Sequence, residues 1–324
     1  MNNNHEFQWS YLHPGYWLTW LGMGSWRLLV MLPYPVMMWL GKQLGLMLHA
    51  LGGYRYQIAE INLKLCFPSM PESERQQLLR DNFISYGIAF FEVGIGWWWP
   101  TERLSKYTQF QGLEHIDRLE GRGALLMAVH YTTLEVGACA LSTQHSIDAM
   151  YRPHKNAVYD YIQSKGRRAR DPAGIVYPRE DVRGMFKALR QGRIIWYAPD
   201  QDYGRKQSVF ASLFGVTAAS VTATARFAKI GNAAVLPFSH VRLPGNQGYR
   251  ITVHPPLENF PEGDDVADAE TINRQVEALI LKHLDQYLWV HRRFKTRPEG
   301  EERPYPKKKK KRVKVRGAGA EAGE

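Results

Sequence analysis

The first regular feature along the chain is an apolar region near its amino terminus. Residues 11–51 are dense in Trp, Leu, Met and Tyr, and the sequence is interrupted by Arg27, Pro33, Pro35 and Lys42. No uncharged run reaches the roughly 20 residues that a spanning helix needs. The composition nevertheless favours a membrane anchor, either a transmembrane helix from which Arg27 snorkels or a helical hairpin lying in one leaflet.

Basic residues indicate on which side of the membrane the rest of the chain lies. The first ten residues contain no Lys or Arg, so the basic start of a cleavable signal is missing. Lys42 lies toward the end of the apolar region, Arg55 and Lys64 follow it, and no Lys or Arg precedes it. The positive-inside tendency therefore predicts that the body lies on the cytoplasmic side.

Beyond this region, apolar positions alternate between helical spacing and the short continuous runs of buried strands. The pattern predicts helices over 72–99, from about 133, and over 156–165, 179–190, 218–229 and 267–284. It predicts strands at 124–129, 147–151, near 175, and at 193–197, 234–241 and 249–253. Alternating strands and helices imply an α/β domain, a layered sheet with helices on both faces, preceded by the N-terminal hydrophobic membrane-anchoring helical segment.

Charge and cysteine content divide the chain further. Residues 307–324 hold 8 basic and 2 acidic residues, and so supply +6 of the formal charge of +11. We expect three parts: an anchor over 1–52, an α/β domain over 53–306, and a disordered basic tail over 307–324. The tail suits an anionic leaflet, although taken alone it also fits a nucleic-acid patch. With two cysteines, Cys66 and Cys139, neither a disulfide framework nor a cysteine zinc site is indicated.

The candidate catalytic residues follow the strand predicted at 124–129. His130 comes directly after this apolar run, where ligands bind in open α/β sheets, and Glu135 follows in a predicted helix start. An imidazole can take a proton from a hydroxyl group, and a carboxylate within reach would orient it. On one helix the two side chains would point about 140° apart, so His130 must lie in the turn before the helix. Alternatively, Glu135 merely completes a capping box with Thr132.

Basic side chains in two places could bind an anionic substrate. Arg152 follows the strand predicted at 147–151, and Arg167, Arg168 and Arg170 form a cluster. Guanidinium groups bind phosphate and carboxylate in a bidentate manner. The alternative for the cluster is a solvated, basic helix end.

An acidic segment follows the strand predicted at 193–197. Asp200 and Asp202 lie at the same sheet edge as His130 if the sheet is parallel, so we expect them near the substrate. The alternative is an acidic turn closed by Gly204. A divalent metal site is disfavoured because no third carboxylate or histidine falls nearby in the sequence.

The spacing His130-x-x-x-x-Glu135 resembles the HxxxxD/E signature of the lysophospholipid acyltransferase superfamily. Further segments resemble the late acyltransferases of lipid A biosynthesis, in particular the lauroyltransferase type: residues 12–22, 65–68, 150–153, 196–204 and 291–300. The set in this order is specific and spans nearly the whole chain. Glycerolipid acyltransferases usually carry a Glu-Gly-Thr-Arg-like block where this chain has Asp200 to Gly204, which argues against a glycerol phosphate acceptor.

The resemblance implies an acyltransferase of lipopolysaccharide biosynthesis at the bacterial inner membrane, with its catalytic domain on the cytoplasmic side. The expected donor is acyl carrier protein carrying a fatty acyl chain, with lauroyl suggested. The expected acceptor is a hydroxyacyl chain of the Kdo-bearing tetraacylated lipid A precursor. Because the thioester is already activated, no nucleotide or metal cofactor is expected, and nucleic acid is not an expected partner.

The resemblance also implies residue roles. His130 is the expected base, and Glu135 is expected to orient its imidazole. Arg167 or Arg170 would meet phosphate or sugar-acid groups of the acceptor. Two alternatives stay open: an acyltransferase with another glycolipid or phospholipid acceptor, and a non-enzymatic basic membrane-binding protein whose His130 and Glu135 belong to a capped turn.

Overall fold

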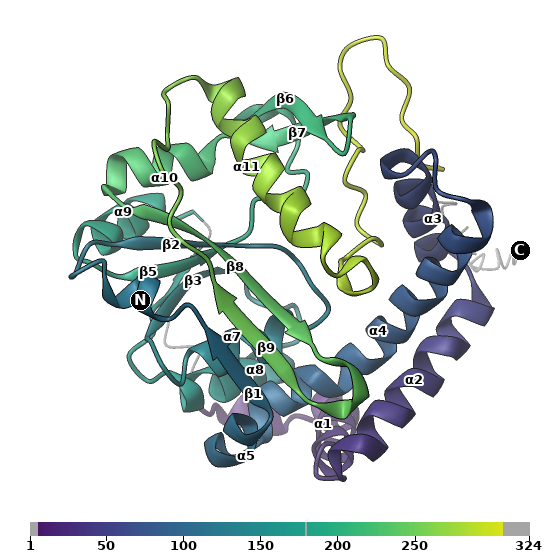
Figure 1. Cartoon of the computed structure of the whole chain (residues 1–324). Coiled ribbons are helices and arrows are strands. Elements are labelled where there is room, and N and C mark those ends of the chain that lie inside the picture. Colours follow the sequence, from purple (N-terminus) through teal and green to yellow (C-terminus); the bar gives the residue numbers. More distant parts are fainter. Residues whose placement is uncertain (1–5, 179, 307–324) are drawn as a thin grey trace, which may run out of the picture.

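A computed structural model of the chain describes residues 6–178 and 180–306. The basic tail expected over 307–324 lies outside these residues. A mixed sheet forms the centre of the described part, in the strand order β1-β9-β8-β2-β5-β3-β4 (Figure 1). Its strands are β1 (Thr108–Gln111), β2 (Ala124–Ala128), β3 (Ile147–Tyr151), β4 (Val176–Pro178), β5 (Ile194–Tyr197), β8 (Ala234–Arg242) and β9 (Tyr249–Val253). Strands β8 and β9 pair antiparallel, and the other neighbouring pairs are parallel.

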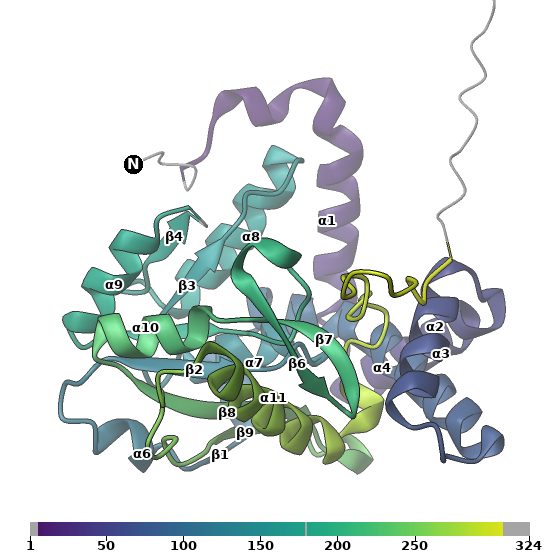
Figure 2. The same cartoon turned by 90° about the horizontal axis from the view of Figure 1, so that it is seen from above.

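Helices cover both faces of this sheet, as Figure 2 shows. The helices are α1 (Trp17–Leu29), α2 (Tyr34–Leu51), α3 (Tyr54–Cys66), α4 (Glu72–Trp98), α5 (Thr101–Lys106), α6 (Glu114–Asp117), α7 (Leu134–Leu141), α8 (Ala157–Arg170), α9 (Val182–Arg190), α10 (Ala223–Gly231) and α11 (Asp265–Leu281). The predicted α/β architecture with a covered sheet is confirmed.

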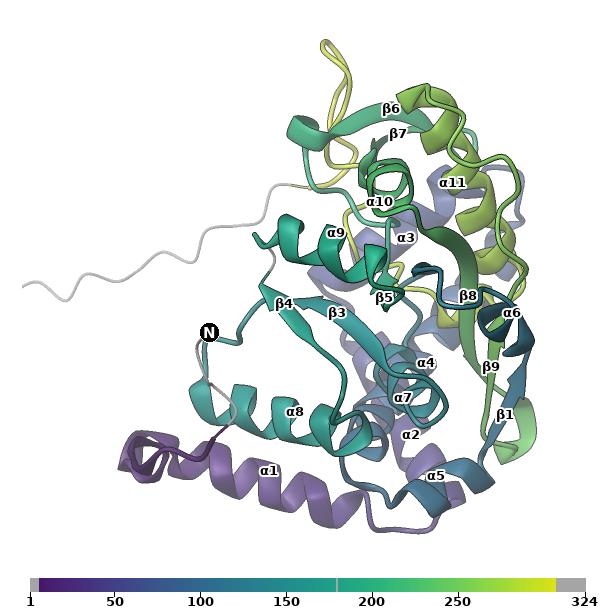
Figure 3. The same ribbon diagram turned by 90° about the vertical axis from the view of Figure 1, so that its left-hand side faces the viewer.

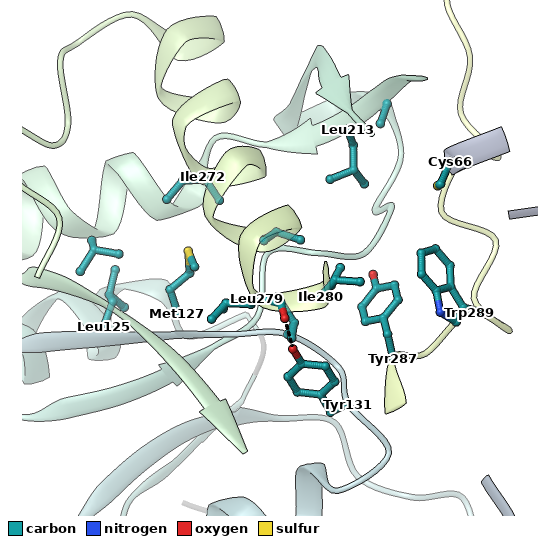
Figure 4. Close-up of a cluster of buried hydrophobic side chains, with 14 of the residues drawn as sticks. Cys66, Leu125, Met127, Tyr131, Leu213, Ile272, Leu279, Ile280, Tyr287 and Trp289 are labelled. Atoms are coloured by element: carbon teal, nitrogen blue, oxygen red, sulfur yellow. Dashed lines mark hydrogen bonds between the residues drawn. The ribbon is translucent and has the colours of Figure 1, made fainter. Parts of the chain in front are cut away.

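Strand β2 explains why the sequence carries a continuous apolar run there. Leu125 and Met127 pack in a cluster with residues of α9, α10 and α11, which Figure 4 shows in part. Leu126 and the alanines at both ends of the strand pack on the opposite face, with residues of α4 and α7. A strand buried on both faces has no polar side to alternate with. The first polar side chain after the run is therefore His130, just beyond the carboxyl end of β2.

The helix predicted over 218–229 begins later than expected. Residues up to Val221 belong to β7 (Val216–Val221), which pairs antiparallel with β6 (Ser208–Leu213). Phe214 and Gly215 connect the strands, both with positive φ (52° and 73°). A two-residue turn of this kind matches the twist of a hairpin. The small residues between Val216 and Val221 fit a helix as well as a strand by composition, and the hairpin decides between them.

The apolar amino-terminal region folds into two separate helices. α1 and α2 are joined through a bend near Pro33. No helix in the described part of the chain is both long enough and apolar enough to span a bilayer, so the expected transmembrane helix finds no support. Part of the region's apolar character instead serves the core, because Tyr34 and Met37 of α2 are fully buried.

Helices α2 and α4 touch through their backbones. A Cβ atom on Gly87 of α4 would lie 2.2 Å from the carbonyl oxygen of Gly41 and 2.2 Å from the amide nitrogen of Gly45. Glycine at this crossing lets the two helices approach more closely than any side chain would permit. The three glycines thus allow α2 to pack directly against α4.

We expect Gly87→Ala to lower the free energy of unfolding by about 1–3 kcal/mol, because the added methyl group must push the two helices apart. Gly22→Ala on α1 is the matched control, since a Cβ there meets no heavy atom within 4 Å. Chemical denaturation followed by circular dichroism measures both variants. Equal stability of the two would contradict the role of the glycine crossing.

Candidate active site

His130 and Asp200 meet at the carboxyl edge of two neighbouring parallel strands. His130 follows β2, Asp200 follows β5, and β2 and β5 pair in parallel. Nδ1 of His130 lies 2.6 Å from Oδ1 of Asp200, and the backbone N–H of His130 donates to Oδ2 of the same carboxylate at 2.8 Å. Both carboxylate oxygens are therefore bonded to one residue, which fixes the imidazole relative to its own backbone.

The electrostatics of this pair favour a charged carboxylate. Asp200 has a fully buried side chain, whereas 20% of the His130 side chain is exposed. Burial by itself would raise the pKa of Asp200, but the charge of His130 and its hydrogen bonds lower it more, so that the pKa lies below its ordinary value. With Nδ1–H donated to the carboxylate, Nε2 of His130 carries the lone pair. This arrangement suits a general base.

The structure corrects the expected partner of the histidine. Glu135 lies in the first turn of α7, and its carboxylate accepts hydrogen bonds from Nε1 of Trp97 (2.6 Å) and from Nε and Nη2 of Arg167 (2.7 and 2.6 Å). The expectation that Glu135 orients the imidazole of His130 is therefore wrong. The physical reason is direction: the first turn of α7 aims Glu135 at α4 and α8, whereas the imidazole faces the end of β5.

Glu135 does not serve as the capping residue of the alternative interpretation either. The residue before α7 is Thr133, whose hydroxyl donates to the carbonyl oxygen of His240 at 2.6 Å and makes no cap hydrogen bond. Burial of Glu135 would raise its pKa, but the charge and hydrogen bonds of Arg167 outweigh burial and hold that pKa below its ordinary value. Glu135 and Arg167 thus form an ion pair that joins α7 to α8.

A cavity of about 420 Å³ opens beside His130. Its wall is largely apolar and aromatic, and the ring of Trp196 meets the His130 ring edge to face, with centroids 5.9 Å apart. Arg152 is exposed and lines the cavity together with Arg226. The other lining residues are Met150, Tyr151, Val182, Phe186, Tyr197, Ala198, Tyr203, Gln207, Val221, Thr222, Ala223 and Phe227. The imidazole thus faces a space that accepts an apolar chain, with cations in its wall.

The other expected binding residues are engaged with the protein itself. Arg170 donates from Nε to the carbonyl oxygen of Gly96 (3.0 Å), from Nη1 to the hydroxyl of Thr101 (3.0 Å), and from Nη2 to the carbonyl oxygen of Trp99. These bonds fix the end of α4. Arg152 differs, because no carboxylate in the described residues forms an ion pair with it.

Asp202 holds the loop after β5 against the segment that contains Thr296. Its carboxylate accepts from the backbone N–H of Thr296 at 2.8 Å and from the hydroxyl of Thr296 at 2.9 Å. Asn62 of α3 and Asn82 of α4 hold the same carboxyl-terminal segment, donating to the carbonyl oxygens of Trp289 (2.6 Å) and Tyr287 (2.8 Å). The segments at 196–204 and 291–300, far apart in the sequence, are thus joined by hydrogen bonds next to the site.

Sequence reasoning missed Asp200 as the partner of His130. The available signal was its place after a strand parallel to that of His130. Within residues 6–178 and 180–306, no cluster of three or more histidines, cysteines, aspartates and glutamates has a geometry that could hold a metal ion.

Comparison with known proteins gives one consistent family. The family model described as bacterial lipid A biosynthesis acyltransferase matches residues 4–296. The chain is 42% identical to the lipid A biosynthesis lauroyltransferase of Escherichia coli K12, covering 94% of this chain and 100% of the relative. It is 40% identical to the palmitoleoyltransferase of the same organism, over 93% and 98% of the two chains. The corresponding myristoyltransferase is 30% identical, over 94% of each chain.

The ion pair of Glu135 predicts a pH-dependent contribution to stability. Because the pKa of Glu135 is lowered in the folded protein from the ordinary 4.5, its contribution is complete above that ordinary value and is lost as the pH falls through the lowered one. We expect Glu135→Gln to be less stable than the wild type by about 1–2 kcal/mol near neutral pH, a figure that allows for solvent at the partly exposed Arg167.

Thermal unfolding of both proteins between about pH 7 and about pH 2 measures this difference, because the loss occurs below the ordinary pKa of the glutamate. The two unfolding midpoints should converge toward the acid end. A constant difference across the range would contradict a charged Glu135 in the folded state.

Proposed function

The chain belongs to the bacterial lipid A biosynthesis acyltransferase family, and from this premise we propose the details of its reaction. The donor is an acyl chain on acyl carrier protein, and the acceptor is a hydroxyl group on a hydroxyacyl chain of the Kdo-bearing tetraacylated lipid A precursor. The observation that carries the proposal is the His130–Asp200 pair beside an apolar cavity. Hydroxyl activation and acyl-chain binding are the two tasks that this transfer requires.

The transfer is direct. Nε2 of His130 takes the proton from the acceptor hydroxyl while its oxygen attacks the carbonyl carbon of the thioester. The resulting tetrahedral intermediate collapses, the C–S bond breaks, and the imidazolium returns the proton to the departing thiolate. Asp200 stabilises the imidazolium between the two steps through the 2.6 Å contact with Nδ1. The products are the new ester and the free thiol of the carrier.

The acyl chain occupies the aromatic part of the cavity. Phe186 and Phe227 line it, with ring centroids 5.3 Å apart. Each buried methylene contributes about 0.8 kcal/mol, so a cavity of fixed depth selects the chain length that fills it. Lauroyl is the proposed chain, because the lauroyltransferase is 42% identical to this chain.

The arginines have two different roles, substrate binding and positioning. Arg152 binds phosphate of the acceptor, since it lines the cavity and has no ion pair in the described residues. Arg167 and Glu135 act by positioning: the guanidinium of Arg167 lies 5.9 Å from the ring centre of Tyr151, which lines the cavity. Holding Tyr151 in place keeps the cavity open beside His130.

Membrane attachment completes the proposal. Leu18, Leu21 and Leu28 of α1 are 68–82% exposed, an arrangement that is costly in water. Trp17 on the same helix and Trp39 on α2 are also exposed, and tryptophan favours the membrane interface. α1 and α2 lie in the surface of the inner membrane, with the sheet on the cytoplasmic side, where both the carrier protein and the lipid acceptor are available.

We expect Asp200→Asn to reduce kcat by two to four orders of magnitude, about the loss that follows when a catalytic histidine is left in the wrong tautomer. His130→Ala should lose at least as much. The assay combines purified protein, acyl carrier protein loaded with chains of increasing length, and the tetraacylated precursor, read by mass spectrometry. His145→Ala, which changes a histidine outside the cavity, is the matched control.

Retained activity in a folded Asp200→Asn protein would contradict the role of the pair. Acylation of a phospholipid in place of the precursor would contradict the proposed acceptor.

For membrane attachment, we expect the double variant Leu18→Ser, Leu21→Ser to bind vesicles more weakly, because the apolar area removed is the area in contact with lipid. Ile230→Ser, Leu281→Ser is the matched control, since both side chains are exposed on other helices. Co-sedimentation with vesicles of bacterial lipids measures the bound fraction. Equal loss in both variants would contradict attachment through α1.

A further inference from the structure

A second cavity, lined in part by α8, has no assigned role. It measures about 440 Å³ and shares no lining residue with the cavity beside His130. It is a groove between α1 and α8, two helices that run side by side in Figures 2 and 3, and it reaches the end of α4. Its lining residues are Phe7, Trp20, Met23, Gly24, Arg27, Trp97, Trp98, Tyr161, Ile162, Lys165, Gly166 and Ala169.

The walls of this groove suit a hydrocarbon chain. Aromatic rings form its sides, and the small residues Gly24 and Ala169 also line it. Gly166 lets Trp97 pack closely against α8, since a Cβ there would lie 2.6 Å from the Cβ of Trp97. A Cβ on Gly24 would meet no heavy atom within 4 Å, so this glycine borders open space and not a packed neighbour. An apolar groove of this kind favours an apolar occupant over water.

Two cations line the same groove. Arg27 of α1 and Lys165 of α8 are exposed, and neither forms an ion pair with a carboxylate in the part of the chain that the structure describes. Nζ of Lys165 lies 5.8 Å from the ring centre of Tyr161. Two unneutralised cations beside an apolar groove are complementary to an acyl chain that ends in an anionic head group.

The position of the groove indicates where such a molecule comes from. α1, which forms one wall, also carries the exposed side chains of Leu18, Leu21 and Leu28. A groove bordered by a helix in the membrane surface is open to bilayer lipids. Because no lining residue is shared with the His130 cavity, its occupant is separate from the chain that reacts there.

We propose that the groove between α1 and α8 binds an anionic phospholipid of the bilayer, with one acyl chain among the aromatic rings and the phosphate at Arg27 and Lys165. The proposal rests on the proposed membrane attachment and not on acyl transfer. Trp97 links the groove to Glu135, since it lines the groove while its Nε1 donates to Glu135 at 2.6 Å. A bound lipid therefore packs against the indole that holds Glu135.

The test compares two tryptophan substitutions on α1. Gly24→Trp fills the groove, whereas Gly22→Trp places the same side chain on the same helix outside it, and a Cβ at either position meets no atom within 4 Å. Native mass spectrometry of the full chain in neutral detergent measures the apparent Kd for phosphatidylglycerol. We expect a rise of about ten-fold or more for Gly24→Trp and little change for Gly22→Trp.

The charge arm uses Lys165→Gln, with Lys229→Gln as the control on α10. Losing one head-group cation should raise the Kd for phosphatidylglycerol about five-fold, whereas the control should not. Phosphatidylcholine should bind the wild type more weakly than phosphatidylglycerol. Matching unfolding midpoints of all variants show that they are folded.

Three results would overturn the proposal: equal lipid binding by Gly24→Trp and Gly22→Trp, equal binding of the two phospholipids, or a raised KM for the lipid A precursor in phospholipid-free detergent that is confined to Gly24→Trp. The last result would assign the groove to the acceptor. An inactive wild type that still shows the expected phosphatidylglycerol binding would support the groove and contradict the proposed reaction alone.

Discussion

The buried carboxylate of Asp200 constrains the whole site. A charge taken out of water must find its hydrogen-bond partners inside the protein, and here His130 supplies one to each oxygen. The ring and the backbone of the histidine are therefore held by the same group. Parallel pairing of β2 with β5 brings the two residues to one edge of the sheet, because parallel strands end on the same side. The orientation of the imidazole therefore follows from the pairing of these two strands.

A second buried carboxylate has a different task. Glu135 joins three helices, since α7 carries it, α8 supplies Arg167 and α4 supplies Trp97. A paired buried charge specifies geometry more than it adds stability, because desolvation offsets much of the attraction. In this site the pair holds Arg167 5.9 Å from the ring centre of Tyr151, which lines the cavity beside His130. Asp200 thus holds His130, whereas Glu135 joins the helices around it.

Local patterns in the sequence predicted most of the sheet and the place of His130, because an apolar run buried on both faces has few other structural solutions. They failed where the answer depended on a distant segment. The partner of His130 lies 70 positions away, and nothing local distinguishes Asp200 from an acidic turn. The short spacing from His130 to Glu135 favours Glu135, the nearer carboxylate in the sequence, as the partner of the imidazole. The helix predicted over 218–229 begins within β7 for the same reason, since the pairing of β7 with β6 is not encoded within Val216–Val221 itself.

A guanidinium group that could bind a substrate anion can instead hold the fold together when carbonyl oxygens of the protein lie within its reach. Arg170 was expected to meet an anionic substrate, yet its guanidinium donates to the carbonyl oxygens of Gly96 and Trp99 and holds the end of α4. That end carries Trp97, which lines the groove between α1 and α8 and donates from its indole to the carboxylate of Glu135. The end of α4 thus joins α8, through Arg170, to α7, through Trp97 and Glu135. The turn that carries His130 is therefore held from two sides, by the parallel strands β2 and β5 and, through α7, by the end of α4.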